Sequence, residues 1–340
     1  MGSSDSEMHP GISRAIHLRS RPAFLPAPED FEIVAAPIPE LTEGQLLVRN
    51  LFFSVDPYKR GRMVERAGGK GFQLGEPLDG PCVGRVAQSK CAGLDKGDYV
   101  LGEKGWREYF VCAASGVTKI ESDQTPVQAY LGVLGMTGFT AFLGLCDVGR
   151  LRCGESVFVS AAAGAVGSVV CQIAALKGCT VVGSAGSEEK VRWLQEHGGI
   201  AAFNYRTAGS IASAVRQCCP DGIDLYFDNV GGPHLEGALE CMNTFGRIVL
   251  CGMMSKMDES SRPFGLTNLN LAIRKRLTLT GFRASDHMHR YTEFSSDMRR
   301  WIREGKIAWT ETIVDGLENA PRAFLGLFKG ENLGKMLVRV

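Results

Sequence analysis

The pattern of hydrophobic and polar positions along the chain changes near residue 155. Before that point, short runs rich in β-branched and aromatic residues alternate with turn residues, and such runs occur at 45–49, 82–86, 98–101 and 108–111. Short strands separated by glycine and proline predict an irregular, β-rich domain. Helical sequence is expected to begin near 125–146.

From Glu155 onward, strand-like and helix-like segments alternate with short connections. The expected strands are 156–160, 180–183, a short one ending at Phe203, 223–227, 247–251 and 277–281, and the expected helices are 166–177, 188–197, 211–218 and 235–242. This alternation predicts a parallel sheet covered by helices on both faces. The strand-like C-terminal run 335–340 is expected to rejoin the first domain, so that the second domain is inserted between two parts of it.

Composition narrows the class of protein. The chain has 340 residues, of which 44% are hydrophobic and 22% charged, and its net charge is +1. This length predicts about two domains, and the near-neutral charge argues against nucleic acid or a membrane as a partner. Eleven cysteines without a C-x-x-C pair, and no signal peptide in residues 1–7, favour a reducing, cytoplasmic location. Two long uncharged stretches, 124–146 and 157–176, contain several glycines, so we expect them to be buried in a soluble protein.

A glycine-rich turn follows the first expected strand of the second half. The strand runs into Ala162-Ala-Gly-Ala-Val-Gly and then a helix, which is the G-x-G-x-x-G pattern with Ala162 in place of the first glycine. Small residues let the backbone approach a pyrophosphate at the helix N-terminus, and Gly167 permits close packing of helix and strand. We therefore predict a dinucleotide site at Gly164, Ala165, Val166 and Gly167. The alternative is a glycine-rich packing turn.

The second expected strand indicates which dinucleotide binds. NAD sites usually place a carboxylate at its tip, about 20 residues on, to hold the ribose 2′-hydroxyl. Here the tip is Gly-Ser-Ala-Gly-Ser at 183–187, and Lys190 follows in the next helix. Small residues leave room for a 2′-phosphate that Ser187 and Lys190 could bind, so NADPH is predicted. Glu188 and Glu189 argue against this, although acids are common in a first helical turn. The alternative for Lys190 is a solvated helix lysine.

Residues with the spacing of a metal site are absent from the sequence. It contains no H-E-x-x-H, no C-x-x-C and no Cys/His cluster, and its six histidines lie in unrelated segments. A catalytic zinc site is therefore not expected. Without a Lewis acid, interconversion of an alcohol and a carbonyl loses its usual electrophile. Conjugate reduction is easier, because hydrogen-bond donors can stabilise the enolate that forms.

Several motifs together resemble one family. They lie at 54–63 (SVDPYKRGRM), 74–80 (LGEPLDG), 135–140 (GMTGFT), 160–167 (SAAAGAVG), 203–206 (FNYR), 227–232 (FDNVGG) and 330–335 (GENLGK). The sequence resembles the zinc-independent prostaglandin reductase, leukotriene hydroxydehydrogenase and alkenal double-bond reductase branch of the medium-chain dehydrogenase/reductase superfamily, over nearly the whole chain from about Phe52. The resemblance implies a Rossmann doubly wound parallel sheet inserted in a β-rich GroES-like catalytic domain. It also implies domains at 1–134 with 310–340 and at 135–309, and a homodimer.

The resemblance further implies a cofactor in the cleft between the two domains. Gly164 to Gly167 would hold the pyrophosphate, and Gly186, Ser187, Lys190 and Tyr205 would lie at the 2′-phosphate. Met136 and Thr140 would approach the nicotinamide, and Asn332 would reach across to the cofactor from the returning C-terminal segment. The rest of the groove would be lined by Asn229, Cys251, Gly252, Met253, Met254, Phe282, Arg283 and Ala284. Simpler alternatives are a packing aromatic at Tyr205, a strand-end residue contributing backbone at Cys251, and a helix cap at Asn229.

Tyr58 is the candidate catalytic residue. Its hydroxyl could donate a hydrogen bond to the substrate carbonyl or enolate, and the alternative is a structural tyrosine beside Pro57. Relatives often carry a second tyrosine between the last two sheet strands, where this sequence has Arg274, and a further one where it has Met257. Solvent or a ribose hydroxyl of the cofactor, assisted by Tyr58, is therefore the expected proton donor.

The sequence thus predicts an NADP-dependent oxidoreductase acting on CH–CH groups. It would reduce the α,β-double bond of enones or enals, such as 2-alkenal or 15-oxoprostaglandin-like substrates, by hydride transfer to the β-carbon. Two alternatives stay open, a quinone oxidoreductase of the zeta-crystallin type and an NADPH-binding structural or adhesion protein without turnover.

Overall fold

The computed structural model describes residues 11–64, 71–121, 125–256 and 265–340. The chain forms two compact units. The first, here called the β-rich unit, comprises Met1–Leu131, Ile313–Leu327 and Met336–Val340. The second, here called the α/β unit, comprises Gly132–Thr312 and Phe328–Lys335. Met257 and residues 1–7, for which the sequence suggested interpretations, lie outside the described residues.

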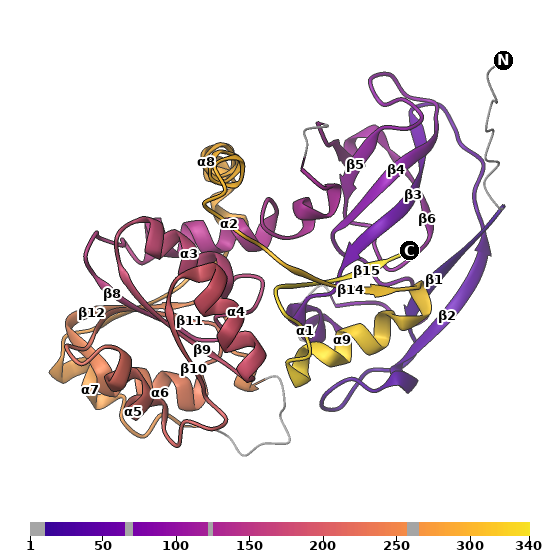
Figure 1. The fold of residues 1–340 in the computed structure, drawn as a ribbon. Coiled ribbons are helices and arrows are strands. Elements are labelled where there is room, and N and C mark those ends of the chain that lie inside the picture. The colour runs from indigo at the N-terminus through magenta and orange to yellow at the C-terminus, as the bar shows by residue number, and fades with distance from the viewer. Residues whose placement is uncertain (1–10, 65–70, 122–124, 257–264) are drawn as a thin grey trace. The chain divides into compact units, whose positions relative to one another are not determined.

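The β-rich unit contains two antiparallel sheets (Figure 1). A two-stranded sheet pairs β1 with β2, and a seven-stranded sheet has the order β14-β15-β3-β4-β5-β7, with β6 pairing β3. The C-terminal strand β15 lies antiparallel to β3, with Val338 opposite Phe53. The strands are β1 Ile12–Leu18, β2 Phe31–Pro37, β3 Gln45–Ser54, β4 Cys82–Ser89, β5 Tyr99–Gly102, β6 Tyr109–Ala113, β7 Val117–Lys119, β14 Glu311–Asp315 and β15 Lys335–Arg339.

Short helical turns and one longer helix connect these strands. They are η1 Pro28–Asp30, η2 Pro57–Lys59, α1 Arg60–Met63, η3 Ala114–Gly116, η4 Val127–Leu131, η8 Leu317–Asn319 and α9 Ala320–Lys329. The fully buried Trp106 lies at the centre of an aromatic cluster. Its ring centroid lies 6.2 Å from Phe31, 5.6 Å from Phe53 and 5.9 Å from Phe324 of α9. The C-terminal part of the chain therefore completes the core of this unit, because α9 supplies one of the four rings.

The α/β unit is built on a six-stranded parallel sheet. Its order is β10-β9-β8-β11-β12-β13, which is the order of a classical doubly wound dinucleotide-binding sheet. The strands are β8 Ser156–Val159, β9 Thr180–Ala185, β10 Ala201–Asn204, β11 Ile223–Asp228, β12 Met242–Leu250 and β13 Thr278–Gly281. The order reverses between β8 and β11, so the carboxyl ends of these two strands form the switch point at which such sheets bind ligands.

Helices cover both faces of this sheet, with α3 and α4 on one side and α5 and α6 on the other (Figure 1). The helices are α2 Met136–Leu143, η5 Gly144–Val148, α3 Gly167–Leu176, α4 Glu188–Gly198, α5 Ile211–Cys218, α6 Gly232–Cys241, η6 Met254–Lys256, α7 Asn270–Arg274, η7 Ala284–Arg290 and α8 Tyr291–Arg303. The predicted parallel sheet with helices on both faces is confirmed.

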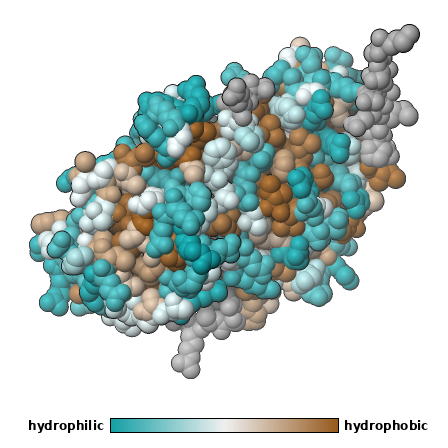
Figure 2. Space-filling model, viewed as in Figure 1, coloured by the Kyte–Doolittle hydropathy of each residue, from teal (hydrophilic) through white to brown (hydrophobic). Residues whose placement is uncertain are grey.

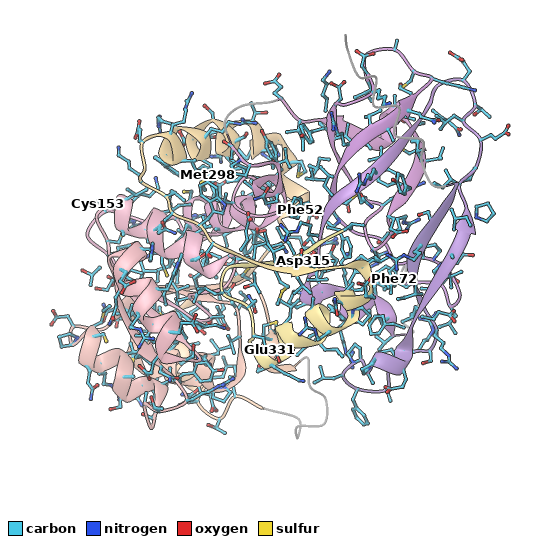
Figure 3. The ribbon with its side chains drawn as sticks, turned by 45° about the vertical axis from the view of Figure 1, so that its right-hand side comes forward. Phe52, Phe72, Cys153, Met298, Asp315 and Glu331 are labelled. Atoms are coloured by element: carbon cyan, nitrogen blue, oxygen red, sulfur yellow. The ribbon has the colours of Figure 1, made fainter. Side chains whose placement is uncertain are left out.

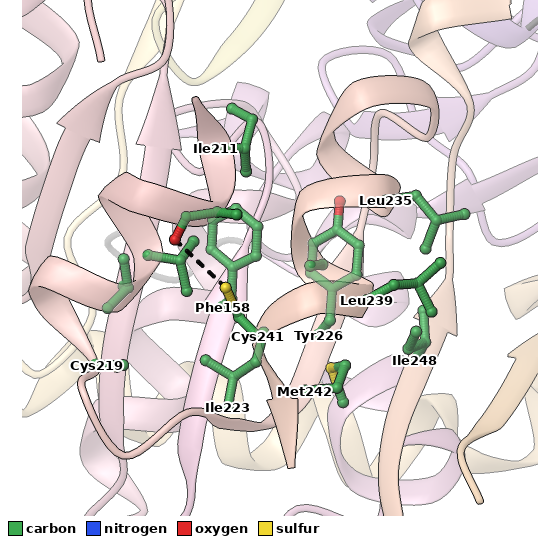
Figure 4. Packing of buried hydrophobic residues seen from close by; sticks show 14 residues of the cluster. Phe158, Ile211, Cys219, Ile223, Tyr226, Leu235, Leu239, Cys241, Met242 and Ile248 are labelled. Atoms are coloured by element: carbon green, nitrogen blue, oxygen red, sulfur yellow. Dashed lines mark hydrogen bonds between the residues drawn. The ribbon is translucent and has the colours of Figure 1, made fainter. Parts of the chain in front are cut away.

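One core cluster explains how the second helix layer is held. Phe158 of β8 stacks on Tyr226 of β11 at a centroid distance of 4.9 Å, and side chains of α5 and α6 pack over both rings (Figure 4). The thiol of Cys241 donates to the backbone oxygen of Ala212 at 3.4 Å and thereby links the two helices. Burying such apolar surface is the main stabilising contribution to packing of this kind.

Several boundaries differ from expectation for identifiable reasons. Helical sequence at 125–146 forms three short pieces, η4, α2 and η5, rather than one helix. At Gly138 an added Cβ would lie 1.9 Å from the carbonyl oxygen of Val133, so the chain there is folded tightly back on itself. Strands β1 and β2 and helices α8 and α9 were not predicted. Strand β12 begins at Met242, five residues before the predicted strand at 247, and the helix expected at 235–242 begins earlier, at Gly232.

The long uncharged stretches lie inside the units. Residues 157–176 form β8, the following turn and α3, and almost all of them are buried except near their C-terminal end and in the turn. Within the described ranges, no helix has the length and apolar character needed to span a membrane. On the face shown in Figure 2, hydrophobic residues are interspersed with hydrophilic ones.

Candidate active site

The glycine-rich turn lies at the switch point, between the end of β8 and the start of α3. Ala161 has a positive φ of 48° there, and the amide of Gly164 donates to the carbonyl oxygen of Ala161 at 3.0 Å. A Cβ at Gly167 would lie only 2.3 Å from that same oxygen, so glycine is required for the helix to start this close to the strand. The predicted packing role of Gly167 is confirmed.

The same turn has room on its outer side. A Cβ placed on Gly164 would meet one heavy atom within 4 Å, the carbonyl oxygen of Ala161 at 3.2 Å. The neighbouring side chains, Ala163, Ala165 and Val166, are small. A ligand can therefore approach the backbone amides and the positive end of the α3 dipole closely, which fits the pyrophosphate of a dinucleotide.

The end of β11 is held to the end of β8 by a buried carboxylate. One oxygen of Asp228 accepts hydrogen bonds from the hydroxyls of Tyr226 at 2.7 Å and Ser160 at 3.2 Å, and from the amides of Val230 at 2.9 Å and Gly231 at 2.7 Å. Asp228 is fully buried, and its other carboxylate oxygen has no partner among the described residues. Asp228 thus sets the path of the loop that carries Asn229.

Asn229 is fixed by Ser160 on the opposite side of the switch point. Its backbone N–H donates to the Ser160 hydroxyl at 2.9 Å, and its side-chain amide donates to the Ser160 carbonyl at 2.8 Å. The residue that precedes α6 as its N-cap is Gly231. The alternative that Asn229 caps a helix is therefore wrong, because the side chain is already engaged across the two strands.

A second group of predicted residues gathers where β9 and β10 end. The Tyr205 amide donates to the Ala185 carbonyl at 3.0 Å, and a Cβ on Gly186 would lie 3.2 Å from the Tyr205 hydroxyl, so the phenol lies against Gly186. Ser187 caps α4, its hydroxyl accepting from the Lys190 amide at 3.4 Å. These contacts bring Gly186, Ser187, Lys190 and Tyr205 together at one corner of the sheet. Lys190 is only partly exposed, so it is not a freely solvated helix lysine.

Behind this corner lies His234 of α6. Its ring meets Tyr205 edge-on at a centroid distance of 4.9 Å, and its Nε2 atom is buried without a partner among the described residues. Burial lowers the pKa of His234 to about 4. The imidazole is therefore neutral at physiological pH and acts here as a packing group for Tyr205.

The segment that begins at the last residue of α9 (here called the C-terminal segment, residues 329–335) belongs to the same unit, and Figure 3 marks it at Glu331. The Gly334 amide donates to the Ala163 carbonyl at 2.8 Å, and Gly164 forms a β-bridge with Gly334. The side-chain amide of Asn332 donates to the Gly334 carbonyl at 2.8 Å. Asn332 thus lies two residues from a direct contact with the glycine-rich turn, although 168 positions separate it from Gly164 in the sequence.

The remaining predicted groove residues line the ends of β12 and β13 and the start of α2. The amides of Cys251 and Gly252 donate to the Asp228 carbonyl at 2.9 and 3.0 Å, and burial raises the pKa of Cys251 to about 12. Cys251 therefore contributes backbone rather than a reactive thiolate. Met253 is exposed, and Met254 begins η6.

Phe282 and Ala284 follow β13, and Phe282 packs against Gly144, where an added Cβ would lie 2.9 Å from its ring. Ala284 is buried and Arg283 exposed. Met136 opens α2 with an exposed side chain, and the Thr140 hydroxyl donates to the Met136 carbonyl one turn earlier at 2.7 Å. Every residue predicted to bind the cofactor therefore belongs to the α/β unit.

Tyr58 belongs to the β-rich unit, in the 3₁₀ turn Pro57–Lys59 after β3. Residues of the motif at 54–63, which contains Tyr58, contact residues of the motif at 74–80. The fully buried Lys59 ammonium donates to the Asp79 carbonyl at 2.7 Å, and Arg62 forms an ion pair of 2.5 Å with the Asp79 carboxylate. A Cβ on Gly80 would lie 1.7 Å from the Lys59 ammonium, so this glycine makes room for the buried lysine.

The Tyr58 side chain is 51% exposed, and its hydroxyl makes no hydrogen bond within the part of the chain that the structure describes. Partial burial, together with the negative charges of Asp56 and Glu103, raises the pKa of Tyr58. The phenol therefore stays protonated through the physiological range and can donate a hydrogen bond. A raised pKa also makes it a poor source of a proton.

Sequence reasoning did not assign three residues that organise these sites. Asp228 and Ser160 occur inside quoted motifs, and Lys59 is a lysine in a polar stretch. A carboxylate that ends an otherwise apolar strand was the available signal for Asp228, because such a buried charge needs several donors. Nothing local to the sequence signals that Lys59 is buried, since its carbonyl partner lies 20 positions away.

Metal-ligating side chains do not gather in the described ranges, where no group of three or more His, Cys, Asp or Glu residues could hold an ion. Arg274, the residue at the expected second tyrosine position, ends the short helix α7. Its neighbour Lys275 donates to the carbonyls of Leu239 and Glu240 at 2.9 and 2.8 Å. The Lys275 ammonium thus contacts the C-terminal end of α6.

The sheet order and the glycine-rich turn at its switch point define a Rossmann-type dinucleotide-binding unit carried by a β-rich unit. Residues 14–120 match the family described as the N-terminal domain of oxidoreductase, and residues 165–301 match the one described as zinc-binding dehydrogenase. The chain belongs to the zinc-independent branch of the medium-chain dehydrogenase/reductase family that includes prostaglandin and alkenal reductases. It is an oxidoreductase of that family.

Individual relatives cover nearly the whole chain. It is 45% identical to the putative NADP-dependent oxidoreductase YfmJ of Bacillus subtilis, over 96% of this chain and 97% of that protein. It is 41% identical to prostaglandin reductase 1 of Bos taurus over 92% and 95% of the two chains. For the NADP(+)-dependent 2-alkenal reductase of Nicotiana tabacum the identity is 39%, over 96% and 97%.

Solved structures agree with this assignment. CurA from Vibrio vulnificus, determined in complex with NADPH, superposes with a TM-score of 0.90 at 38% identity, covering 96% of this chain and 99% of that one. The Escherichia coli quinone oxidoreductase has a TM-score of 0.77 at 20% identity. At that identity the likeness shows a shared fold and says nothing of a shared substrate.

Proposed function

We propose that this enzyme is an NADPH-dependent reductase of the α,β-double bond of enones and enals. The observation that carries the proposal is the corner formed by Gly186, Ser187, Lys190 and Tyr205. It offers an ammonium, a hydroxyl and a phenol at the end of β9, where an NAD site would place a carboxylate. The NADP-dependent names of the relatives, and the NADPH held by CurA, support the same cofactor.

The residues of the α/β unit fit such a cofactor. The turn Gly164–Gly167 would hold the pyrophosphate on backbone amides, and Lys190 with Tyr205 would hold the 2′-phosphate. Asn229 and the backbone of Cys251 and Gly252 would line the groove, and Asn332, Met136 and Thr140 would lie toward the nicotinamide. When bound, NADPH supplies the hydride for reduction of the double bond.

The role of Tyr58 follows from its protonated phenol. Reduction of a conjugated double bond places negative charge on the carbonyl oxygen of the substrate, and a positioned donor stabilises that charge chiefly in the transition state. The Tyr58 hydroxyl has no other partner in the described residues. Because its pKa is raised, we propose that Tyr58 donates a hydrogen bond to the enolate oxygen while the proton that reaches carbon comes from solvent or a ribose hydroxyl.

A substrate panel tests this function. Purified enzyme is mixed with NADPH and 2-alkenals, aryl enones or small quinones, and NADPH absorbance is followed while products are identified by mass spectrometry. We expect saturated aldehydes and ketones from the enals and enones. Turnover of quinones alone would favour a quinone oxidoreductase, and tight NADPH binding without any turnover would favour a structural or adhesion role.

The surface near β13 supports a further proposal, that the protein is a homodimer. β13 is the last strand of the six-stranded sheet, and within the part of the chain that the structure describes β12 is its one strand neighbour. Close to it in the chain, Ile273 is 81% exposed and Leu269 is 47% exposed. An unpaired strand edge with nearby apolar side chains suits pairing with a second copy. Light scattering after gel filtration measures the mass, and a monomer at micromolar concentration would contradict this proposal.

The state of the cysteines supports a cytoplasmic location, which we also propose. All eleven are free thiols in the structure. Free cysteines in this number are typical of proteins kept in a reducing compartment. Fractionation of the source cells with detection of the native protein tests the location, and recovery from an oxidising compartment would contradict it.

A further inference from the structure

The corner proposed to hold the 2′-phosphate contains a second cation, Arg206. It follows Tyr205 directly after β10, and its guanidinium carbon lies 5.9 Å from the centroid of the Tyr205 ring. Its Nη2 atom lies 3.4 Å from the carbonyl oxygen of Lys329, to which it donates. The Lys190 ammonium donates to the next carbonyl of the C-terminal segment, that of Gly330, at 2.6 Å. Two cations from different elements therefore hold successive carbonyls of one segment.

The two positive charges lie close enough to affect each other. Burial lowers the pKa of Lys190, and the charge of Arg206 lowers it further. Among the described residues neither cation forms a salt bridge with a carboxylate, and their partners are neutral carbonyl oxygens. Two adjacent cations without an anionic partner favour an anion such as a phosphate.

The turn that presents Arg206 is fixed by Asn204. The Asn204 side-chain oxygen accepts from the Arg206 amide at 3.0 Å, and its carbonyl accepts from the Thr207 hydroxyl at 3.3 Å. The side-chain amide of Asn204 donates to the Glu188 carboxylate at 2.8 Å. Glu188 is the first acidic residue after β9, near the point where an NAD site would place its carboxylate. Its carboxylate binds the neutral amide of Asn204, and among the described residues it forms no salt bridge with Lys190 or Arg206.

We propose that Arg206 is a specificity-determining residue that, together with Lys190, binds the 2′-phosphate of the adenine ribose. This inference rests on the NADPH dependence proposed above. Lys190 has three donors and Arg206 five, so each can keep its carbonyl contact while donating to the phosphate.

Calorimetric titration with two small probes tests this without any turnover. Adenosine 2′,5′-bisphosphate carries the 2′-phosphate, and adenosine 5′-monophosphate lacks it. Arg206→Gln should raise the Kd of the bisphosphate about tenfold, the size expected when one charge-assisted hydrogen bond is lost. The Kd of the monophosphate should change less than twofold. Arg206→Lys keeps the charge but not the planar fork, so it should recover part of the affinity.

A matched control is Arg216→Gln. Arg216 lies on α5, and its guanidinium forms an ion pair of 3.1 Å with the exposed carboxylate of Glu240. This variant should bind both probes like the parent. Unfolding midpoints of all variants check that they are folded. An equal loss of affinity for both probes in Arg206→Gln would overturn the proposal, because it indicates a structural role. An unchanged Kd for the bisphosphate would also overturn it while leaving NADPH dependence intact. If the parent does not prefer the bisphosphate, the cofactor assignment and this inference both fail, whereas double-bond reduction is tested separately by the substrate panel.

Discussion

The ammonium of Lys190 donates a hydrogen bond of 2.6 Å to the carbonyl oxygen of Gly330, which lies 140 positions later in the sequence. The bond joins the start of α4 to the segment that also carries Asn332. One lysine therefore connects the corner proposed for the 2′-phosphate with the segment proposed to approach the nicotinamide. We therefore expect replacement of Lys190 to affect both the corner and the C-terminal segment.

Replacing Lys190 by alanine should weaken binding of NADPH by about 1.5–3 kcal/mol, because a charge-assisted hydrogen bond to the phosphate is lost. Binding of NADH should hardly change. Fluorescence titration with the two cofactors measures both affinities. Lys306→Ala is a suitable control, because its ammonium pairs with exposed Glu304. Equal losses for NADPH and NADH would mean that Lys190 acts only by holding the C-terminal segment.

Tyr58→Phe keeps the ring and deletes only the hydroxyl. Loss of a main donor to a developing oxyanion typically lowers the rate about 10²–10³-fold, and ribose hydroxyls would compensate in part. We therefore expect turnover of the best enone to fall at least about tenfold while the Kd of NADPH stays unchanged. Steady-state kinetics and NADPH titration are the measurements, with Tyr109→Phe in the same unit as a control. Parent-like turnover would show that Tyr58 only shapes the pocket.

Dialysis against a strong chelator should change neither the activity nor the melting temperature. The reason lies in the sequence, which contains no set of ligands with the spacing of a zinc site. Activity assays and thermal unfolding before and after dialysis test this, with elemental analysis of the same samples. One zinc ion per chain that is lost together with activity would contradict the proposed chemistry.

His234 predicts a specific dependence of stability on pH. Its pKa is lowered by burial from 6.5 to about 4, so the folded state excludes a proton that the unfolded chain binds. The stabilisation from keeping the imidazole neutral is complete above pH 6.5 and is lost as the pH falls from 6.5 toward 4. Between pH 7.5 and pH 5.0 this residue should lower the free energy of unfolding by about 2 kcal/mol.

Urea unfolding of the parent and of His234→Gln at these two pH values isolates the effect. The parent should lose about 2 kcal/mol more than the variant on acidification. His17, a partly exposed histidine on β1 whose Nδ1 atom lies 2.7 Å from the Gly75 carbonyl oxygen, provides a control in His17→Gln. An identical pH dependence of parent and His234→Gln would show that His234 is not buried as a neutral ring.

The local sequence determined the type of most elements in the α/β unit. Helix α5 has the predicted bounds Ile211–Cys218, because its apolar positions repeat with the helical period and Ser210 caps its first turn. The glycine-rich turn was also recognisable from its run of small residues. The close approach of α3 to the end of β8 leaves no room for a Cβ at Gly167. The missing carboxylate after β9 was equally visible and predicted the choice of cofactor.

Tertiary structure alone decided which of these residues meet. The order of the sheet places β8 beside β11, so Ser160 and Asp228, which are 68 positions apart, share a hydrogen bond and hold Asn229 in place. It also brings Arg206 and Lys190 to neighbouring carbonyls of the C-terminal segment. Local periodicity reports which face of an element is buried but not which distant element covers it. Every buried N–H, C=O and polar side chain needs a hydrogen-bond partner, and many of these partners are distant in the sequence. Strand order and buried hydrogen bonds are therefore set only when the whole unit folds.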